Sequence, residues 1–184
     1  MTLWDPPAGF DQPLAALAAC HRRIEKQMHT LARLQKHIAR NGVDDEARSA
    51  IEGVLKYFIE AAPNHHADEE LDLFPRVLRA AEGSADRASA FDLIAHLMVE
   101  HRDMEEVWDR VHEALDALLA GGATELDPQL IRDFARIYAD HIFREEKQLF
   151  PLAEKLLKSP DWVALGTAMA ARRGLPAPQF LPAP

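Results

Sequence analysis

Two stretches of the 184-residue sequence decide the fold: HHADEELDLFP at residues 65–75 and HIFREEKQLFP at residues 141–151. Each carries a histidine that is followed four residues later by a glutamate, and each ends in Leu-Phe-Pro. On an α-helix, residues four apart point within about 40° of each other, so each stretch can offer an imidazole and a carboxylate to the same small volume. We therefore expect both stretches to be helical and to turn these polar side chains inward.

The polar pattern is part of a longer internal repeat. HRRIE at residues 21–25 recurs as HRDME at residues 101–105, an offset of 80 residues, and the two longer stretches lie 76 residues apart. A helix pair that is repeated in this way packs about a pseudo-twofold axis, which brings equivalent inward residues together from opposite sides. Residues present in both halves are therefore candidates for one shared site.

Clusters of helix-breaking residues divide the body of the chain into four long segments; the clusters are NGVDDE (41–46), AEGSAD (81–86) and AGGATELDPQ (120–129). Within each segment the apolar residues recur at spacings of three and four, which is typical of a helix in a bundle. The sequence thus predicts an all-α fold, an antiparallel up-down four-helix bundle with a pseudo-twofold internal repeat and a short C-terminal extension.

We expect the bundle to occupy residues 1–158 and residues 159–184 to form a short helix and a Pro-rich tail. Trp4 and Phe10 should cover the bundle from its N-terminal side. The C-terminal extension is assigned no chemistry. Pro75 and Pro151, at matching places in the two halves, should kink their helices just past the polar residues.

The repeat also chooses between two registers in the second segment. Either His65 with Glu69 or His66 with Glu70 would satisfy the four-residue spacing. Aligning the two halves on Leu-Phe-Pro places His66 opposite the apolar Ile142 and leaves His65 opposite a histidine. We therefore choose His65 and Glu69.

Six inward residues form the candidate metal site: His21, His65, Glu69, His101, His141 and Glu145. An unpaired carboxylate on a buried helix face costs on the order of several kcal/mol in desolvation, and a bound cation is the simplest compensation. Imidazole and carboxylate together suit iron, manganese or zinc. The alternative is a buried polar network without metal, which would have to satisfy every member with hydrogen bonds.

Other polar residues are expected to play smaller parts. Glu25 and Glu105 also follow a histidine by four residues, but the apolar pattern turns them toward the surface. His66 and the histidines off the apolar stripes, His29, His37 and His96, are expected on the surface. Tyr138, one turn before His141, could donate a hydrogen bond at the site or approach a metal.

These motifs resemble those of the hemerythrin-like family, also called the HHE cation-binding domain. The resemblance covers about residues 11–158 and depends on the two copies of His-x-x-x-Glu-Glu-x-x-Leu-Phe-Pro and the His-Arg helix before each. It implies a four-helix bundle that holds two Fe ions as a bridged di-iron centre. It also implies terminal imidazole ligands at His21, His65, His101 and His141, with Glu69 and Glu145 as bridges.

The sequence departs from the oxygen carriers of that family. They have a further histidine one turn before the third-helix ligand, where this chain has Leu97, and an aspartate where it has Glu146. Four histidines and two glutamates leave open or water-filled positions on the irons, which argues against stable oxygen carriage. Bacterial members with such sites are linked to O2 or NO sensing, to iron handling and to repair after nitrosative stress. We therefore expect a protein that binds a small diatomic ligand, or handles iron, rather than an enzyme.

Bulk composition narrows the remaining classes. The balance of 21 basic to 30 acidic side chains gives a formal charge of −9, which disfavours nucleic acid and anionic membranes as partners. No apolar run approaches the roughly 18 residues that span a bilayer, and the N-terminus lacks the features of a signal peptide. With a single cysteine, Cys20, we expect a cytoplasmic protein. Nothing in the sequence sets the oligomeric state.

Two other classes of helical protein compete with the di-iron hypothesis. Ferritin-like di-iron oxidases share the bundle but are recognised by Glu-x-x-His on two helices, a spacing that this sequence lacks. A metal-free helical interaction module would not require inward histidines on all four helices.

Overall fold

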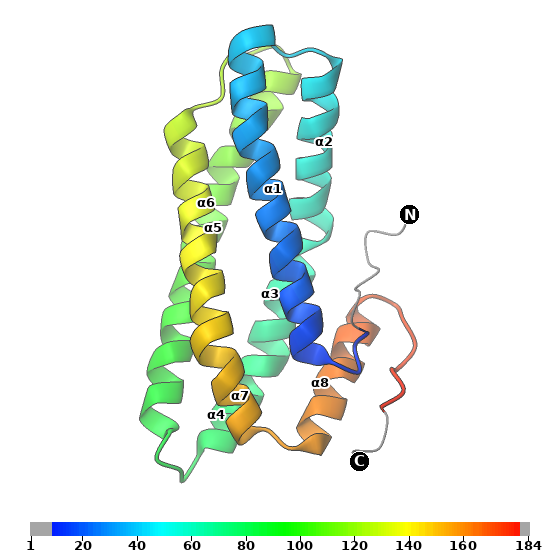
Figure 1. The fold of residues 1–184 in the computed structure, drawn as a ribbon, viewed down its shortest axis with the longest axis vertical. Helices are drawn as coiled ribbons and strands as arrows, with labels where there is room; N and C mark the ends of the chain where they lie inside the picture. The colour runs from blue at the N-terminus through cyan, green and yellow to red at the C-terminus, as the bar shows by residue number, and fades with distance from the viewer. Residues whose placement is uncertain (1–8, 181–184) are drawn as a thin grey trace.

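The computed structural model describes residues 9–180, and this part of the chain contains helices and no strand, which confirms the all-α prediction. Trp4, expected to cover the bundle, lies outside the described residues, as does the end of the tail at residues 181–184. Four long helical segments lie side by side along the long axis of the molecule (Figure 1), an arrangement consistent with a four-helix bundle.

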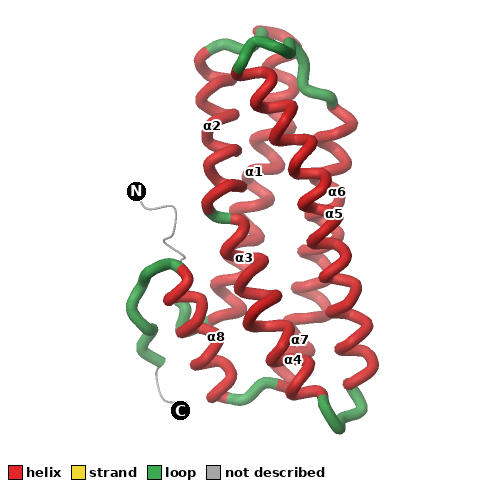
Figure 2. Tube along the Cα trace, turned by 180° about the vertical axis from the view of Figure 1, so that it is seen from behind, coloured by secondary structure: helices red, strands yellow, loops and turns green. Residues whose placement is uncertain are grey.

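The first and third segments are the single helices α1 (Pro13–Asn41) and α5 (Arg87–Leu119). The second and fourth segments are each interrupted by a π-helical turn. They consist of α2 (Asp45–Glu60), α3 (Ala62–Asp68), η1 (Glu69–Leu73) and α4 (Phe74–Ala81), and of α6 (Pro128–Arg144), η2 (Glu145–Leu149) and α7 (Phe150–Leu156). A further helix, α8 (Ser159–Arg172), lies beside α1 and α3 (Figure 2).

Side-chain caps and glycines fix the ends of several helices. Asp44 accepts a hydrogen bond from the backbone N–H of Ala47 at the start of α2, and Asp127 accepts one from Gln129 at the start of α6. Helix α1 ends at Asn41 and is followed by Gly42, whose φ of 73° lies in the left-handed region that favours glycine. These signals agree with the breaker clusters in the sequence.

Both π-helical turns begin at a glutamate of the candidate site. The backbone N–H of Phe74 donates to the carbonyl of Glu69 five residues earlier, and that of Phe150 donates likewise to Glu145. A proline follows each phenylalanine, and in a regular α-helix its ring would press on the carbonyl four residues earlier. Because the wider π-helical turn relieves that crowding, Pro75 and Pro151 coincide with a local widening of the helix.

The apolar core lies in two parts, one on each side of a polar layer. One part is built from residues such as Ile24, Leu31, Leu115 and Phe134, and the other from residues such as Leu17, Leu73, Leu97 and Leu149. The second part also includes Phe10 and the inner face of α8. The polar layer between them holds the six residues of the candidate site.

Among residues 9–180, no helix has both the length and the apolar character needed to cross a membrane.

Candidate metal centre

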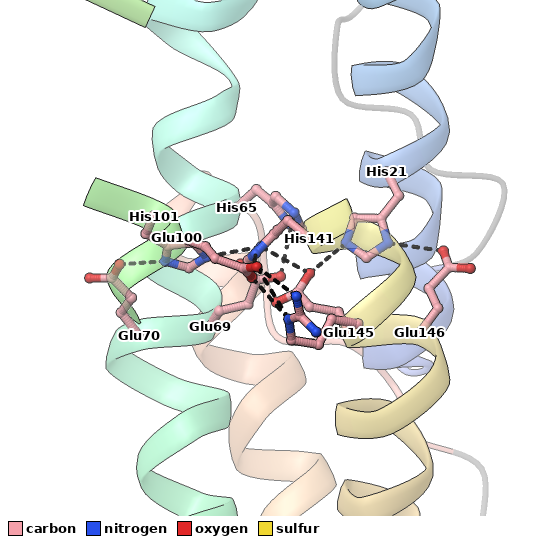
Figure 3. Close-up of polar contacts among 10 residues, drawn as sticks. His21, His65, Glu69, Glu70, Glu100, His101, His141, Glu145 and Glu146 are labelled. Carbon is pink, nitrogen blue, oxygen red and sulfur yellow. Dashed lines mark hydrogen bonds and ion pairs between the residues drawn. The ribbon is translucent and has the colours of Figure 1, made fainter. Parts of the chain in front are cut away.

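All six residues predicted from the sequence meet in this buried layer (Figure 3). Each is at most 1% exposed: His21 from α1, His65 from α3, Glu69 from η1, His101 from α5, His141 from α6 and Glu145 from η2. The π-helical turns start at the two glutamates, so the local widening lies directly at the site. π-Helical turns are frequent where a helix carries functional residues.

The six residues form two groups of four that could each hold a cation. The first group is His21, His65, Glu69 and Glu145, and the second is Glu69, His101, His141 and Glu145. Within each group the available ligand atoms all lie within 4.8 Å of one another. Both glutamates belong to both groups, so the arrangement has two adjacent positions with two shared carboxylates.

Each glutamate lies between one histidine of the first group and one of the second. Glu69 places its two oxygens 3.4 Å from Nε2 of His65 and 3.6 Å from Nε2 of His101. Glu145 places Oε2 3.0 Å from Nε2 of His21 and 3.5 Å from Nε2 of His141. Every histidine therefore turns the same ring nitrogen, Nε2, toward the carboxylates.

The other ring nitrogen of three histidines donates to a carboxylate outside this layer of six. Nδ1 of His21 is 2.9 Å from Oε1 of Glu146, and Nδ1 of His101 is 2.5 Å from Oε1 of Glu70. Nδ1 of His141 is 3.0 Å from Oε2 of Glu100 (Figure 3). A carboxylate at Nδ1 fixes the ring and its tautomer, which leaves the lone pair of Nε2 free to coordinate a cation.

Glu100 is itself held in place by the positively charged side chain of Arg144. The guanidinium of Arg144 donates to it at 3.0 Å and 3.2 Å, and His96 lies 3.1 Å away. Burial alone would raise the pKa of Glu100, but the hydrogen bonds from His141 and Arg144 outweigh burial and lower it to about 2. Glu100 therefore stays ionised while it holds His141.

The buried carboxylates are not satisfied by protein donors. Within the described residues, none of the four oxygens of Glu69 and Glu145 has a hydrogen-bond partner. Nε2 of His21 is near enough to Glu145, but the angle between them does not make a hydrogen bond. Buried polar atoms of native proteins are nearly always paired, so these oxygens fit a bound cation.

Electrostatics of the site also fit a cation. Burial and the neighbouring carboxylate of Glu145 raise the pKa of Glu69 well above its ordinary value. Burial opposes the charge of Glu145 as well, but His141 and His21 hold its pKa below the ordinary value. Burial and the nearby His21 lower the pKa of His65 well below its usual range, so that ring is neutral and able to coordinate.

The predicted roles of the neighbouring residues had mixed outcomes. Glu25 and Glu105 are exposed, as the apolar pattern predicted, and Leu97 is fully buried in the core. The prediction that His66 lies on the surface was wrong: it is half-buried and its ring stacks on that of His101, with centroids 4.3 Å apart. The only sign in the sequence that His66 lies near the site was its position next to His65. The alignment of the two halves, which places His66 opposite Ile142, argued against such a role.

The C-terminal extension, for which we predicted no chemical role, contributes two arginines that pair with acids close to Glu69. Arg172 pairs with both Asp68 and Asp72, and Arg173 places a guanidinium nitrogen 2.7 Å from Oδ2 of Asp68. Asp68 is fully buried and directly precedes Glu69. The C-terminal helix is therefore attached to the segment that carries a site glutamate.

A cavity of about 410 Å³ lies beside the centre, between α2, α3 and α5. Its apolar walls include Phe58, Met104 and Trp108, and its inner side carries His66 and Tyr138. Tyr138 is buried, one turn before His141 on α6. The cavity thus reaches the ring that stacks on His101.

The family described as the hemerythrin HHE cation binding domain matches residues 12–153. A protein of Haemophilus influenzae (strain ATCC 51907 / DSM 11121 / KW20 / Rd), described as uncharacterized, is 30% identical over 166 residues. That alignment covers 90% of this chain and 92% of the relative.

Proposed function

The chain belongs to the hemerythrin HHE cation-binding family, and from that premise we propose that it holds a pair of iron ions between its helices. The proposed ligands are His21, His65, Glu69, His101, His141 and Glu145. The glutamates would bridge the two ions and the histidines would be terminal ligands.

The observation that carries this proposal is that both glutamates are shared. Glu69 and Glu145 each contact one histidine from either group through the nitrogen that faces inward. A single cation would leave two of the four inward imidazoles without a partner. Two cations use all six side chains and neutralise both buried carboxylates.

We further propose that the two halves of the bundle are related by a pseudo-twofold axis in an antiparallel up-down topology. Glu70 of the second segment reaches the histidine of the third, and Glu146 of the fourth reaches the histidine of the first. The π-helical turns fall at matching places in the two halves. These pairings support equivalent roles for the repeated residues.

The ligand set supports binding of a small diatomic molecule, O2 or NO. Four histidines and two bridging glutamates do not fill the coordination of two iron ions, so exchangeable positions remain for a ligand. A reduced iron pair would supply the electrons for binding O2 or NO. The cavity lined by His66 and Tyr138 offers an apolar approach to the His101 side of the centre.

A reducing compartment suits this chemistry, and the lone Cys20 is consistent with one. We therefore propose that the protein works in the cytoplasm, as a sensor of O2 or NO or in iron handling.

Metal analysis tests the proposal. The protein, produced with adequate iron, should contain two iron ions per chain and absorb in the near-ultraviolet when oxidised. Glu69→Ala should lose metal, whereas Glu25→Ala should retain it, because Glu25 has the same spacing from its histidine but is exposed. A metal content near zero, or one zinc ion per chain, would overturn the di-iron assignment. Anaerobic titration of the reduced protein with O2 and with NO would then identify the ligand.

A further inference from the structure

The two ends of the centre differ in how their histidines are held. His65 and His141 occupy equivalent places in the repeat. Nδ1 of His141 donates to Glu100, which is fixed by Arg144. Nδ1 of His65 is equally buried, yet no group of the described chain pairs with it.

The repeat shows why the partner is missing. Glu100 directly precedes His101, and the residue that directly precedes His21 is Cys20. A buried cysteine therefore stands where the other half has the carboxylate that holds a histidine. A thiol is a weak acceptor and cannot replace that carboxylate.

The residue equivalent to Arg144, which fixes Glu100, also differs in the first half. Arg144 lies three residues after His141, and the equivalent residue three after His65 is Asp68. The carboxylate of Asp68 is bound by Arg172, at the end of α8, and by Arg173, which follows it; both lie outside the family match. The first half thus has an acid close to its histidine, but that acid is bound to a different partner.

The consequence is an unequal pair of cation positions. Both histidines of the second group, His101 and His141, are held by a carboxylate, whereas the first group has only His21 held in this way. A carboxylate behind a ligating histidine orients the ring and raises its basicity, and losing one typically costs about 10–100-fold in metal affinity.

We propose that the position formed by His21 and His65 exchanges iron faster than the position formed by His101 and His141. Dissociation of the ion would begin at His65. The inference rests on the proposed function, since it requires two bound ions. It gives the centre a fixed ion at His101 and His141 and an exchangeable ion at the opposite end.

Release of iron from the reduced, fully loaded protein to an excess of a colour-forming ferrous chelator tests the inference. Two phases of equal amplitude are expected, with rates that differ by about 10–100-fold. A protein that never holds two ions would overturn the proposed function itself. A pair of ions that leaves in a single phase would overturn only this inference.

Two variants assign the phases to the two ends. Cys20→Glu supplies the missing carboxylate and should slow the fast phase, while Cys20→Ser, the control, should not. Glu100→Gln removes the carboxylate at the other end and should quicken the slow phase, so the test stands even if a glutamate at position 20 prevents folding. The inference is wrong if Glu100→Gln alters the fast phase alone, with circular dichroism confirming that the variant is folded.

Discussion

Oε1 of Glu70 lies 2.5 Å from Nδ1 of His101, on a different helix, although Glu69 beside it in the sequence faces the interior of the bundle. Neighbouring acids on one helix point about 100° apart, and the structure uses both directions. Glu69 is available to a cation, and Glu70 orients a histidine that is available to the same cation. Glu145 and Glu146 divide their roles in the same way.

Alanine substitution should therefore separate the members of each pair. Glu69→Ala removes a carboxylate shared by both positions and should empty or halve the site. Glu70→Ala should keep the stoichiometry and weaken binding by about 10–100-fold, because it releases only the outer nitrogen of His101. Metal per chain after dialysis, combined with a competition titration, would distinguish the two results.

The same comparison in the fourth segment is stricter. Glu146 occupies the place where the oxygen carriers of the family have their bridging aspartate, but here it lies 2.9 Å from the outer nitrogen of His21. Glu145→Ala should lose metal and Glu146→Ala should retain it. If the outcomes were exchanged, the fourth segment would follow the carriers and our assignment of Glu145 would fail.

Much of the site could be predicted because its information is local and duplicated. The His-x-x-x-Glu spacing places two side chains on one helical face, and its recurrence after 76 residues resolved the choice between His65 and His66. The apolar stripes correctly turned Glu25 and Glu105 outward. Periodicity of this kind fixes direction along one helix and so locates residues that share a face.

The remaining features depend on contacts between segments, which periodicity does not report. Glu100 holds His141 across two helices, and its place beside His101 gave no sign of this partner. The ion pairs from Arg172 and Arg173 to Asp68 join positions more than 100 residues apart. The π-helical turns follow from crowding at Pro75 and Pro151, where the sequence had predicted kinks.

Acid should strip the centre of metal before the protein unfolds. Only a neutral imidazole coordinates, so protonation competes with the cation at each histidine. At His21, burial would lower the pKa, but Glu145 and Glu146 raise it above the ordinary value. Affinity is thus full above that raised pKa and falls as the pH drops through it. Iron retained on gel filtration between pH 8 and pH 4 measures this, and a content that stays constant until unfolding would contradict the ligand assignments.

Glu100 should stabilise the metal-free protein in a pH-dependent manner. Its pKa is lowered to about 2 by His141 and Arg144 against the effect of burial, so its contribution is present above the ordinary glutamate pKa and is lost as the pH falls toward 2. At pH 7, Glu100→Gln should lower the free energy of unfolding by about 1.5–3 kcal/mol, the usual value of charged hydrogen bonds. Urea unfolding at several pH values should show this difference narrowing below about pH 4.5. Glu106→Gln, at an exposed site on the same helix, is the control, and a gap that widens in acid would refute the account.

The buried pair of Asp68 and Arg173 should be among the strongest links between α8 and the bundle. Their side chains are 0% and 2% exposed, and Asp68 has a second cationic partner in Arg172. Arg173→Ala leaves Asp68 with Arg172 and should cost about 1.5–3 kcal/mol in unfolding free energy, the usual value of charged hydrogen bonds, with a further loss from the contact of the guanidinium with the Phe10 ring.

A double-mutant cycle separates the ion pair from that packing. Asp68→Ala combined with Arg173→Ala should cost less than the sum of the single changes, with a coupling of about 0.5–3 kcal/mol, because each single change already removes the interaction between the two side chains. Arg76→Ala is a matched control: Arg76 pairs with Asp72 at 2.9 Å within one helical segment, but it is more exposed than Arg173, so its loss should cost less than that of Arg173. Strictly additive effects of the Asp68 and Arg173 changes would show that the interaction between these two side chains does not stabilise the fold. In that case the position of Glu69, next to Asp68, would not depend on the ion pair from Arg173.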